Sequence, residues 1–402
     1  MNQLAFAPTK GLAQQNYPHF IKYMGSKSKI MDFVVDGLNQ VHDGGAVCDL
    51  FAGSGSLAGA IGRQASIVSN DIQAYSAVIA DTYLNAWLHP RMPKGEDIIA
   101  RAERLVGKRR IELPIEFDFS LSPSRDDFLL VEKKHQLLIE QEFDDDWHLF
   151  IKNYSGTWWS AEQCAWIDAI RAVAEDYRET PFFNAILSCL MYAMAYTSQG
   201  TGHYAQFRDA KTDSSLKDIL IYRRRSITFY FLKKYHELLA WLPREPSGLN
   251  HRVMTGDFGD CLEAFEGGTI YADPPYCFVH YSRFYHALET LVLYDYPELQ
   301  VKNGKIVKGR YRDDRHQSPF CIRSQVREAF SSMLEGVKAS GSKLVLSYSN
   351  TGMISIEEIG DLVAEHLPAM KAEVLTTDHQ HMTLGRQKDR HREVKECLVL
   401  VK

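Results

Sequence analysis

An apolar segment at residues 46–50 runs directly into a turn that carries Gly53 and Gly55, and a helical pattern begins at residues 57–61. Two glycines between a strand and a helix let the backbone turn tightly and let another molecule approach it closely. A second strand pattern follows at residues 66–69. This order of strand, turn, helix and strand predicts an α/β fold.

The chain divides into three stretches by pattern. Residues 1–82 and 250–402 carry alternating strand and helix signals, whereas residues 83–249 have long runs of helical periodicity and clustered aromatic residues. We therefore expect a doubly wound, Rossmann-like sheet with helices on both faces, built from the first and last stretches, and an inserted, mostly helical domain. The strands expected in the last stretch lie near residues 252–255, 269–272, 343–348, 371–377 and 394–401.

Composition limits the class of protein and the cellular compartment to be expected. The 402 residues are 45% hydrophobic and 24% charged, which is enough for two domains with cores of their own. Seven cysteines without a CxxC pair predict a reduced, cytoplasmic protein with no structural zinc or other metal. No apolar run approaches the roughly 18 residues needed to cross a bilayer, so no membrane role is expected. The net charge of -5 argues against a protein coated with nucleic acid, but a local basic face is compatible with phosphate contacts.

The glycine turn is a weak signal by itself, because such turns are common between strands and helices. Asp71, at the end of the next expected strand, strengthens it, since a carboxylate there can accept hydrogen bonds from both ribose hydroxyls of a nucleoside. Capping the following helix is the alternative role for Asp71. Gly53, Gly55 and Gly59 are spaced as GxGxxxG, which is not a dinucleotide fingerprint, and no Walker lysine–serine pair follows. S-adenosylmethionine, an adenosine ligand without phosphate, suits this loop better.

Residues 273–276 read Asp-Pro-Pro-Tyr at the end of the strand expected near residues 269–272. Two consecutive prolines cannot donate ladder hydrogen bonds, so they end the strand and present an acid and an aromatic ring on a stiff turn. Simple strand termination is one interpretation. The chemical interpretation is that Asp273 and the backbone carbonyl of Pro274 hold the two N–H groups of an exocyclic amine and direct its lone pair at a methyl donor.

Four segments in this order resemble the Dam-like, alpha-type DNA N6-adenine methyltransferases: residues 23–27 (YMGSK), 49–55 (DLFAGSG), 70–71 (ND) and 273–276 (DPPY). The resemblance implies an S-adenosylmethionine-dependent methyltransferase domain in two halves. Residues 1–82 would be the cofactor-binding half, residues 250–402 the catalytic half, and residues 83–249 a target-recognition domain. It also implies methyl transfer to the N6 atom of a flipped-out adenine in a specific double-stranded DNA site, with a cognate restriction or defence nuclease as partner.

The family pattern also assigns roles to residues. Catalysis falls on Asp273, Pro274, Pro275 and Tyr276, and the tyrosine ring is expected to stack on the extruded base. Lys27 is expected to reach the methionine end of the cofactor, with solvent exposure as its alternative, whereas a plain Gly–Asp turn is the alternative for Asp257. The expected cofactor contacts are Tyr23, Gly25, Lys27, Asp49, Phe51, Gly53, Gly55, Asp71 and Asp257.

DNA contacts are expected from local basic segments, because the chain as a whole is slightly acidic. Residues 302–305 (KNGK) predict a hairpin turn thin enough to enter a groove. Residues 200–208 only loosely fill the place of an Asn-Gly-Leu-aromatic-Arg stretch that is common in the family. The candidate recognition loop is residues 198–213, which are rich in Gly, Ser and Thr. Solvated charged faces are the alternative for each basic run, and the acidic run 144–146 is expected to face away from DNA. The predicted DNA contacts are His203, Tyr204, Arg208, Arg223, Arg224, Arg225, Lys305, Arg310 and Arg386.

Two other functions stay open at this point. The first is an RNA adenine-N6 methyltransferase, because related DPPY elements occur in enzymes that methylate RNA. The second is a degenerate methylase that serves as a DNA-binding module. The intact motif residues argue against the second, and a comparison of methyl incorporation into duplex DNA and structured RNA separates the first.

Overall fold

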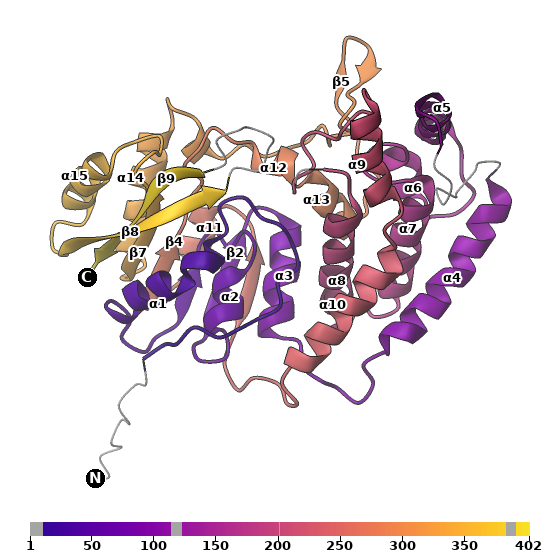
Figure 1. The fold of residues 1–402 in the computed structure, drawn as a ribbon. Coiled ribbons are helices and arrows are strands. Elements are labelled where there is room, and N and C mark those ends of the chain that lie inside the picture. The colour runs from indigo at the N-terminus through magenta and orange to yellow at the C-terminus, as the bar shows by residue number, and fades with distance from the viewer. Residues whose placement is uncertain (1–10, 114–122, 201, 383–390) are drawn as a thin grey trace.

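A mostly parallel sheet forms the centre of one part of the molecule. The computed structural model describes residues 11–113, 123–200, 202–382 and 391–402. Within them a seven-stranded sheet has the order β3-β2-β1-β4-β7-β9-β8, in which only β9 runs antiparallel to its neighbours (Figure 1). The strands are β1 (Val47–Asp49), β2 (Ile67–Asp71), β3 (Arg252–Thr255), β4 (Thr269–Ala272), β7 (Lys343–Ser349), β8 (Ala372–Met382) and β9 (His391–Val401).

Helices cover both faces of this sheet, as the doubly wound pattern predicts. Alternating strand residues explain why: Leu344 and Leu346 of β7 enter the core on one face, whereas Val345 between them enters the core on the other. One face packs against α1 (Met31–Asn39), α2 (Ser56–Ile61) and α3 (Ala74–Leu84). The other packs against α11 (Phe258–Glu263), α14 (Val326–Ala339) and α15 (Ile356–His366).

A helical lobe lies beside the sheet and is joined to it through α3 (Figure 1). On α3, Thr82 shares a 2.9 Å hydroxyl contact with Ser188, and Asp81 accepts a 2.7 Å hydrogen bond from Asn184. Both partners belong to the lobe, so its core is continuous with one core of the sheet. The helices of the lobe are α4 (Gly95–Glu112), α5 (Arg125–Gln136), α6 (Leu149–Tyr154), α7 (Ala161–Glu175), α8 (Phe182–Thr197), α9 (Asp213–Arg223) and α10 (Ile227–Trp241).

The segment between β4 and α14 crosses from the sheet to the helical lobe. It contains α12 (Tyr281–Phe284) and α13 (His286–Leu293). The ring of His286 contacts the carbonyl oxygen of Tyr204 at 3.0 Å and the hydroxyl of Tyr154 at 3.1 Å. The lobe is therefore completed by residues from the last stretch of the chain.

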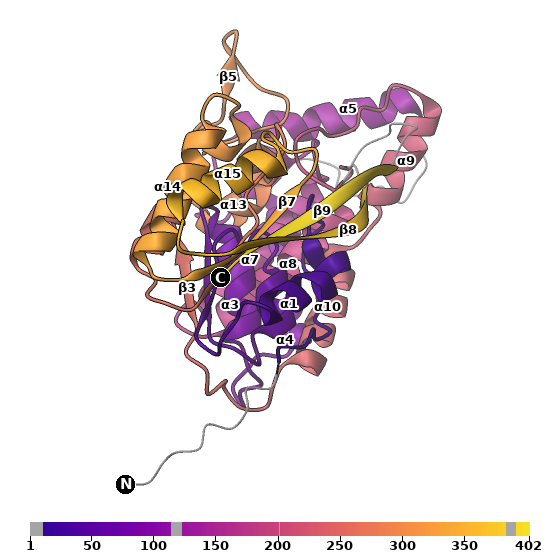
Figure 2. The same ribbon diagram turned by 90° about the vertical axis from the view of Figure 1, so that its left-hand side faces the viewer.

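The same segment also forms the two-stranded hairpin β5 (Val301–Lys302) and β6 (Lys305–Ile306), which projects from the body in both views (Figures 1 and 2). Asn303 and Gly304 at its tip have φ values of 53° and 71°, as a two-residue hairpin turn requires. The hairpin predicted at residues 302–305 is confirmed. At its base, Arg312 holds Asp295 through two 2.7 Å hydrogen bonds.

The expected strands are all present, and some are longer than predicted. β2 extends to Asp71, β8 extends to Met382 and β9 begins at His391. Three 3-10 helices complete the described elements: η1 (Lys27–Ile30), η2 (Leu137–Glu140) and η3 (Pro319–Cys321).

Candidate functional site

A cavity opens where β1, β2 and β4 end at the same edge of the sheet, with about 1120 Å³ of empty space that includes its mouth to solvent. This is the edge at which open α/β sheets bind ligands. The cavity brings together segments that are far apart in the sequence, namely the turn before η1, the glycine loop and the Asp-Pro-Pro-Tyr turn. The predicted catalytic and cofactor residues that line it are Tyr23, Gly25, Lys27, Asp49, Phe51, Gly53, Asp71, Asp257, Asp273, Pro274, Pro275 and Tyr276.

The carboxylate of Asp71 holds the glycine loop through hydrogen bonds with the backbone. The backbone N–H of Gly53 donates to Asp71 Oδ2 at 2.8 Å, and the N–H of Gln73 donates to Asp71 Oδ1 at 2.9 Å. Gly53 has a φ of 53°, and a Cβ there would lie 2.9 Å from the ring of Tyr23. Helix α3 takes its N-cap at Gln73, so Asp71 supports the turn before the helix and is not its N-cap.

The position of Gly55 differs from that of the other predicted cofactor residues. Its φ is 67°, and a Cβ would meet Ile79 at 3.1 Å and Tyr83 at 3.3 Å, so it faces α3 and is not among the residues that line the cavity. The contact of Gly55 with the cofactor therefore stays a prediction. The close approach of α3 explains the glycine.

Three carboxyl groups converge on the floor of the cavity. Asp49 is 2% exposed, and its pKa is raised well above the ordinary value by burial and by the neighbouring charges of Asp273 and Asp71. Burial also raises the pKa of Asp71, against the lowering effect of the backbone N–H groups that it accepts. A site with this charge favours a ligand that carries positive charge or hydrogen-bond donors.

Asp273 stands at the start of the proline turn, with its Oδ1 atom buried beside the Lys27 ammonium. Its side chain keeps 17% exposure and lines the cavity. Burial raises the pKa of Asp273 to about 7, with the Lys27 ammonium pulling it down and the Glu396 carboxylate pushing it up. The carboxyl is therefore close to its ionisation midpoint at neutral pH.

Lys27 is buried, so the solvent-exposed alternative is excluded. Its Nζ lies 3.2 Å from Asp273 Oδ1 and forms an ion pair and hydrogen bond with Glu396. Burial alone would lower the pKa of Lys27, but the two carboxylates outweigh it and raise the pKa. The Lys27 ammonium thus contacts Asp273 and Glu396, whereas the predicted contact was with the methionine end of the cofactor.

Glu396 was missed by the sequence reasoning. It is fully buried in β9 and accepts a 2.9 Å hydrogen bond from the hydroxyl of Ser347. A signal was present, because strand alternation places Glu396 on the same face as the apolar residues Leu398 and Leu400. An acid in such a position needs a buried partner.

Aromatic rings form the sides of the cavity. Tyr23 stacks on Tyr285 with ring centroids 4.9 Å apart, and the ring of Phe51 packs against those of Phe258 and Phe320 at 5.9 Å and 5.4 Å. Tyr276 is buried, and Lys27 Nζ lies 5.1 Å from its ring centroid. These rings provide flat apolar surfaces beside the three carboxyl groups.

Asp257 is exposed at the rim and caps α11, where its Oδ1 accepts a 2.9 Å hydrogen bond from the N–H of Gly259. It also lines the cavity, so the structural role and the predicted role are compatible. In the described part of the chain, no group of three or more His, Cys, Asp or Glu residues could hold a metal ion. No helix in that part is long and apolar enough to span a membrane.

Three predicted DNA contacts are corrected by burial. Arg223 donates to both carboxylate oxygens of Glu132, at 3.1 Å and 2.7 Å, and to the carbonyl of Thr157 at 2.9 Å, inside the helical lobe. Tyr204 is 3% exposed, and its ring packs against two tryptophans. His203 is 9% exposed and stacks on Phe284. These side chains stabilise the lobe and the segment at residues 202–208.

The other predicted DNA contacts keep some exposure. Arg224 and Lys305 are exposed, and Arg208 is half-buried and pairs with Asp218 at 3.2 Å. Arg225 is half-buried and donates to the carbonyl of Tyr196 at 2.7 Å. Arg310 is half-buried, and Arg386 lies outside the described residues.

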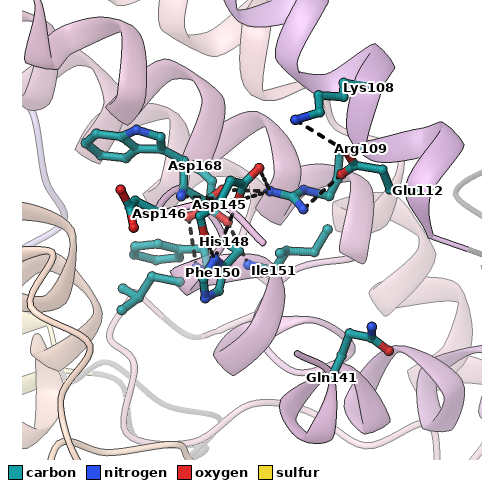
Figure 3. A network of polar contacts seen from close by, with 12 residues as sticks. Lys108, Arg109, Glu112, Gln141, Asp145, Asp146, His148, Phe150, Ile151 and Asp168 are labelled. Carbon is teal, nitrogen blue, oxygen red and sulfur yellow. Dashed lines mark hydrogen bonds and ion pairs between the residues drawn. The ribbon is translucent and has the colours of Figure 1, made fainter. Parts of the chain in front are cut away.

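Asp145 and Asp146 of the acidic run belong to a polar network in the helical lobe (Figure 3). Asp145 accepts hydrogen bonds from Arg109 at 2.7 Å and 2.8 Å. Nearby, buried Asp168 accepts the backbone N–H groups of Phe150 and Ile151 at 2.9 Å and 2.8 Å. Asp145 and Asp168 thus have structural partners that sequence alone did not indicate.

Comparison with known proteins assigns most of the chain to a family. A family described as D12 class N6 adenine-specific DNA methyltransferase matches residues 23–358. Modification methylase LlaI of Lactococcus lactis subsp. lactis is 23% identical over 372 residues, which are 90% of this chain and 51% of that protein. Type II methyltransferase M.FokI of Planomicrobium okeanokoites is 23% identical over 355 residues, which are 86% of this chain and 47% of that protein.

A relative of similar length is type II methyltransferase M2.HphI of Haemophilus parahaemolyticus. It is 23% identical over 393 residues, which are 94% of this chain and 96% of that protein. The chain thus spans about half the length of the LlaI and FokI proteins and nearly all of the HphI protein.

Proposed function

The chain belongs to the D12 class N6 adenine-specific DNA methyltransferase family, and on that premise we propose that it methylates adenine N6 in a specific double-stranded DNA site. One observation carries the proposal: Asp273, on its stiff proline turn, lines the same cavity as Gly53 and Asp71. The proposed acceptors of the substrate amine and the glycine loop proposed to bind a nucleoside therefore line the same cavity.

The proposed methyl donor is S-adenosylmethionine, which supplies an activated methyl group on a positively charged sulfur when it is bound. The residues present fit it. Asn70 Oδ1 and Gln73 Oε1 are buried without hydrogen-bond partners among the described residues, and both residues line the cavity. Donor groups of a ligand would satisfy such atoms. The carboxyl groups of Asp49 and Asp71 complement a cationic ligand, and Asp71 would hold the ribose while Phe51 packs near the sulfur.

The proline turn would act on the substrate amine. The lone pair of the adenine N6 atom is delocalised into the ring, so two acceptors must hold its N–H groups for the lone pair to point outward. We assign these acceptors to the Asp273 carboxylate and the Pro274 carbonyl, while Pro275 stiffens the turn. As N6 gains its bond to the methyl carbon, the bond from that carbon to the donor sulfur would break, and N6 would lose a proton that Asp273 would accept. Tyr276 would stack on the extruded base.

We propose that DNA lies across the cavity mouth between the sheet and the helical lobe. The projecting β5–β6 hairpin, with Lys305 exposed near its tip, would contact one groove. Arg224, the exposed C-cap residue of α9, would contact phosphate. Residues 83–249 would form the recognition domain, completed by the segment that contains α13.

Protection of DNA from a cognate restriction endonuclease is the proposed biological role. Its support is that relatives of this chain are named modification methylases and type II methyltransferases. A nuclease partner is part of this proposal.

The test is single-molecule mapping of methylated adenine on duplex DNA treated with the protein and S-adenosylmethionine. We expect N6-methyladenine at one short sequence and none with Asp273→Ala. Asp43→Ala, a change of an exposed acid far from the cavity, is the matched control and should retain activity. Methylation of structured RNA in place of duplex DNA would overturn the choice of substrate, and unaltered DNA modification by Asp273→Ala would overturn the catalytic assignment.

A further inference from the structure

We propose that Glu396 is a positioning residue for Asp273 and that it acts through Lys27. The inference rests on the proposed role of Asp273 as the acceptor of the substrate amine. It adds a member of the site that comes from the C-terminal strand, outside every motif recognised in the sequence.

Sheet topology brings the three residues together. Asp273 follows β4, Glu396 lies on β9, and β7 separates these two strands. Ser347 of β7 donates its hydroxyl to Glu396 Oε1 at 2.9 Å, and Lys27, from the first turn of η1, reaches between the two acids. The Lys27 Nζ pairs with Glu396 and lies 3.2 Å from Asp273 Oδ1.

The two contacts of the ammonium are not equivalent. Lys27 Nζ donates a hydrogen bond to Glu396, whereas its ion pair with Asp273 Oδ1 is longer, at 3.2 Å, and lowers the pKa of Asp273 through both charge and hydrogen bonding. The geometry therefore anchors the lysine on Glu396 and lets it act on Asp273 as a nearby charge. A lysine without this anchor would turn fully onto Asp273 and occupy the acceptor that the substrate amine needs.

The charges support the same role. Lys27, Asp273 and Glu396 together carry a net charge of about −1 when all three are ionised. The single ammonium therefore does not neutralise both carboxylates, and Asp273 can act as a hydrogen-bond acceptor. Lys27 also lies 5.1 Å from the Tyr276 ring centroid, which links the anchored lysine to the second functional side chain of the turn. The other groups that face Asp273 are Asp49 from β1, Tyr271 from β4, Tyr276 from the turn, Tyr281 from α12 and the hydroxyl of Ser347 from β7.

A merely structural ion triad is the competing explanation, and pH separates the two. The Glu396 charge raises the pKa of Asp273 and the Lys27 charge lowers it. Loss of Glu396 should therefore move the acid limb of the methylation rate to lower pH. Loss of Lys27 should move that limb to higher pH. Changes that only loosen the fold would lower the rate without moving the limb in opposite directions.

The experiment measures single-turnover methylation of duplex DNA from pH 5 to 9 for the wild type, Glu396→Gln and Lys27→Met. We expect Glu396→Gln to lower the rate plateau at least about tenfold and to move the acid limb down in pH, and Lys27→Met to move it up. S-adenosylmethionine affinity, measured by calorimetry, should change less than about threefold for Glu396→Gln. Ser347→Ala removes only the hydroxyl bond and should cause a smaller loss in rate. Acid limbs that stay in place in both variants would overturn the proposal.

A second measurement does not need activity. The difference in Tm between wild type and Asp273→Asn at pH 8 is compared with the same difference in a Glu396→Gln background. We expect the stabilisation by Asp273→Asn to shrink in that background, because the repulsion from Glu396 is gone. Equal differences in the two backgrounds would overturn the proposal even if the protein methylates DNA. A wild type that methylates no adenine would refute the proposed function and leave this charge coupling measurable.

Discussion

Asp71 accepts a 2.8 Å hydrogen bond through Oδ2 from the backbone N–H of Gly53, so the acid expected to bind a ribose also fixes the glycine loop. Its other oxygen is held by the N–H of Gln73 at 2.9 Å. The carboxylate is thus oriented before any ligand arrives. Each of its oxygens keeps acceptor capacity for another donor.

Asp71→Ala is expected to weaken S-adenosylmethionine binding by about 10- to 100-fold, because a hydrogen bond to a charged group contributes about 1.5–3 kcal/mol and the Gly53 loop loses its brace. Asp71→Asn keeps one acceptor oxygen and should lie between Ala and the wild type. Isothermal titration with S-adenosylmethionine measures both. Wild-type affinity in Asp71→Ala would show that the carboxylate does not contribute to the ligand site.

Gly53→Ala and Gly304→Ala form a matched pair. Both glycines have positive φ, 53° and 71°, so each substitution strains the backbone. A Cβ at Gly53 would lie 2.9 Å from the Tyr23 ring, whereas nothing lies within 4 Å of a Cβ at Gly304. We expect Gly53→Ala to abolish measurable cofactor binding and Gly304→Ala to leave it within about twofold of the wild type, since its added methyl group meets no atom of the site.

The same titration checks this pair, with circular dichroism to verify that both variants fold. A Gly304→Ala variant that loses as much cofactor affinity as Gly53→Ala would mean that general backbone strain is responsible. In that case the crowding beside Tyr23 would not explain the glycine.

Local pattern was sufficient to predict the strands of the sheet and the hairpin. Strands near residues 269–272 and 343–348 are short apolar runs bounded by turn residues, and both appear as β4 and β7. The KNGK hairpin followed from turn chemistry alone. In these cases the residues that determine the structure are neighbours in the sequence.

Predictions that depended on distant partners were less successful. The arginine run 223–225 gives no indication of Glu132, which is on another helix and draws Arg223 inside. Successive helical residues point about 100° apart, so one basic run divides between core and surface. The link from Lys27 to Glu396 likewise depends on sheet order, which periodicity does not encode.

Arg223→Ala is expected to destabilise the protein by about 3–5 kcal/mol, because it leaves the Glu132 carboxylate buried without its partner. Arg224→Ala should change the free energy of unfolding by less than about 0.5 kcal/mol. Chemical denaturation of the two variants tests this contrast. Equal stability of the two variants would contradict the structural assignment of Arg223.

For DNA affinity, Arg224→Ala should have a larger direct effect than Arg223→Ala. We expect Arg224→Ala to weaken duplex binding and to reduce the salt dependence of affinity by about one unit of slope, as loss of one phosphate contact does. Fluorescence anisotropy at several salt concentrations measures this. An unchanged salt slope would remove Arg224 from the DNA interface.

Asp273→Asn is expected to stabilise the protein more at pH 8 than at pH 5 while it removes activity. The folded-state pKa of Asp273 is about 7, above its ordinary value of 3.8, because burial disfavours the ionised form. The folded protein therefore binds more protons than the unfolded chain between these values, and its stability falls as pH rises through this range. The cost above pH 7 is on the order of a few kcal/mol, reduced by screening at the partly exposed side chain. Asparagine carries no charge at either pH.

Tm measurements on the wild type and Asp273→Asn at pH 5 and pH 8 check this prediction. Asp43→Asn is the control, since the hydrogen bond from Lys343 holds the pKa of that surface carboxyl below its ordinary value. That substitution should give no gain in Tm at pH 8. If Asp273→Asn also gave no gain in Tm at pH 8, the Asp273 carboxylate would be well solvated. The proline turn would then not hold an acid with a pKa near neutral pH.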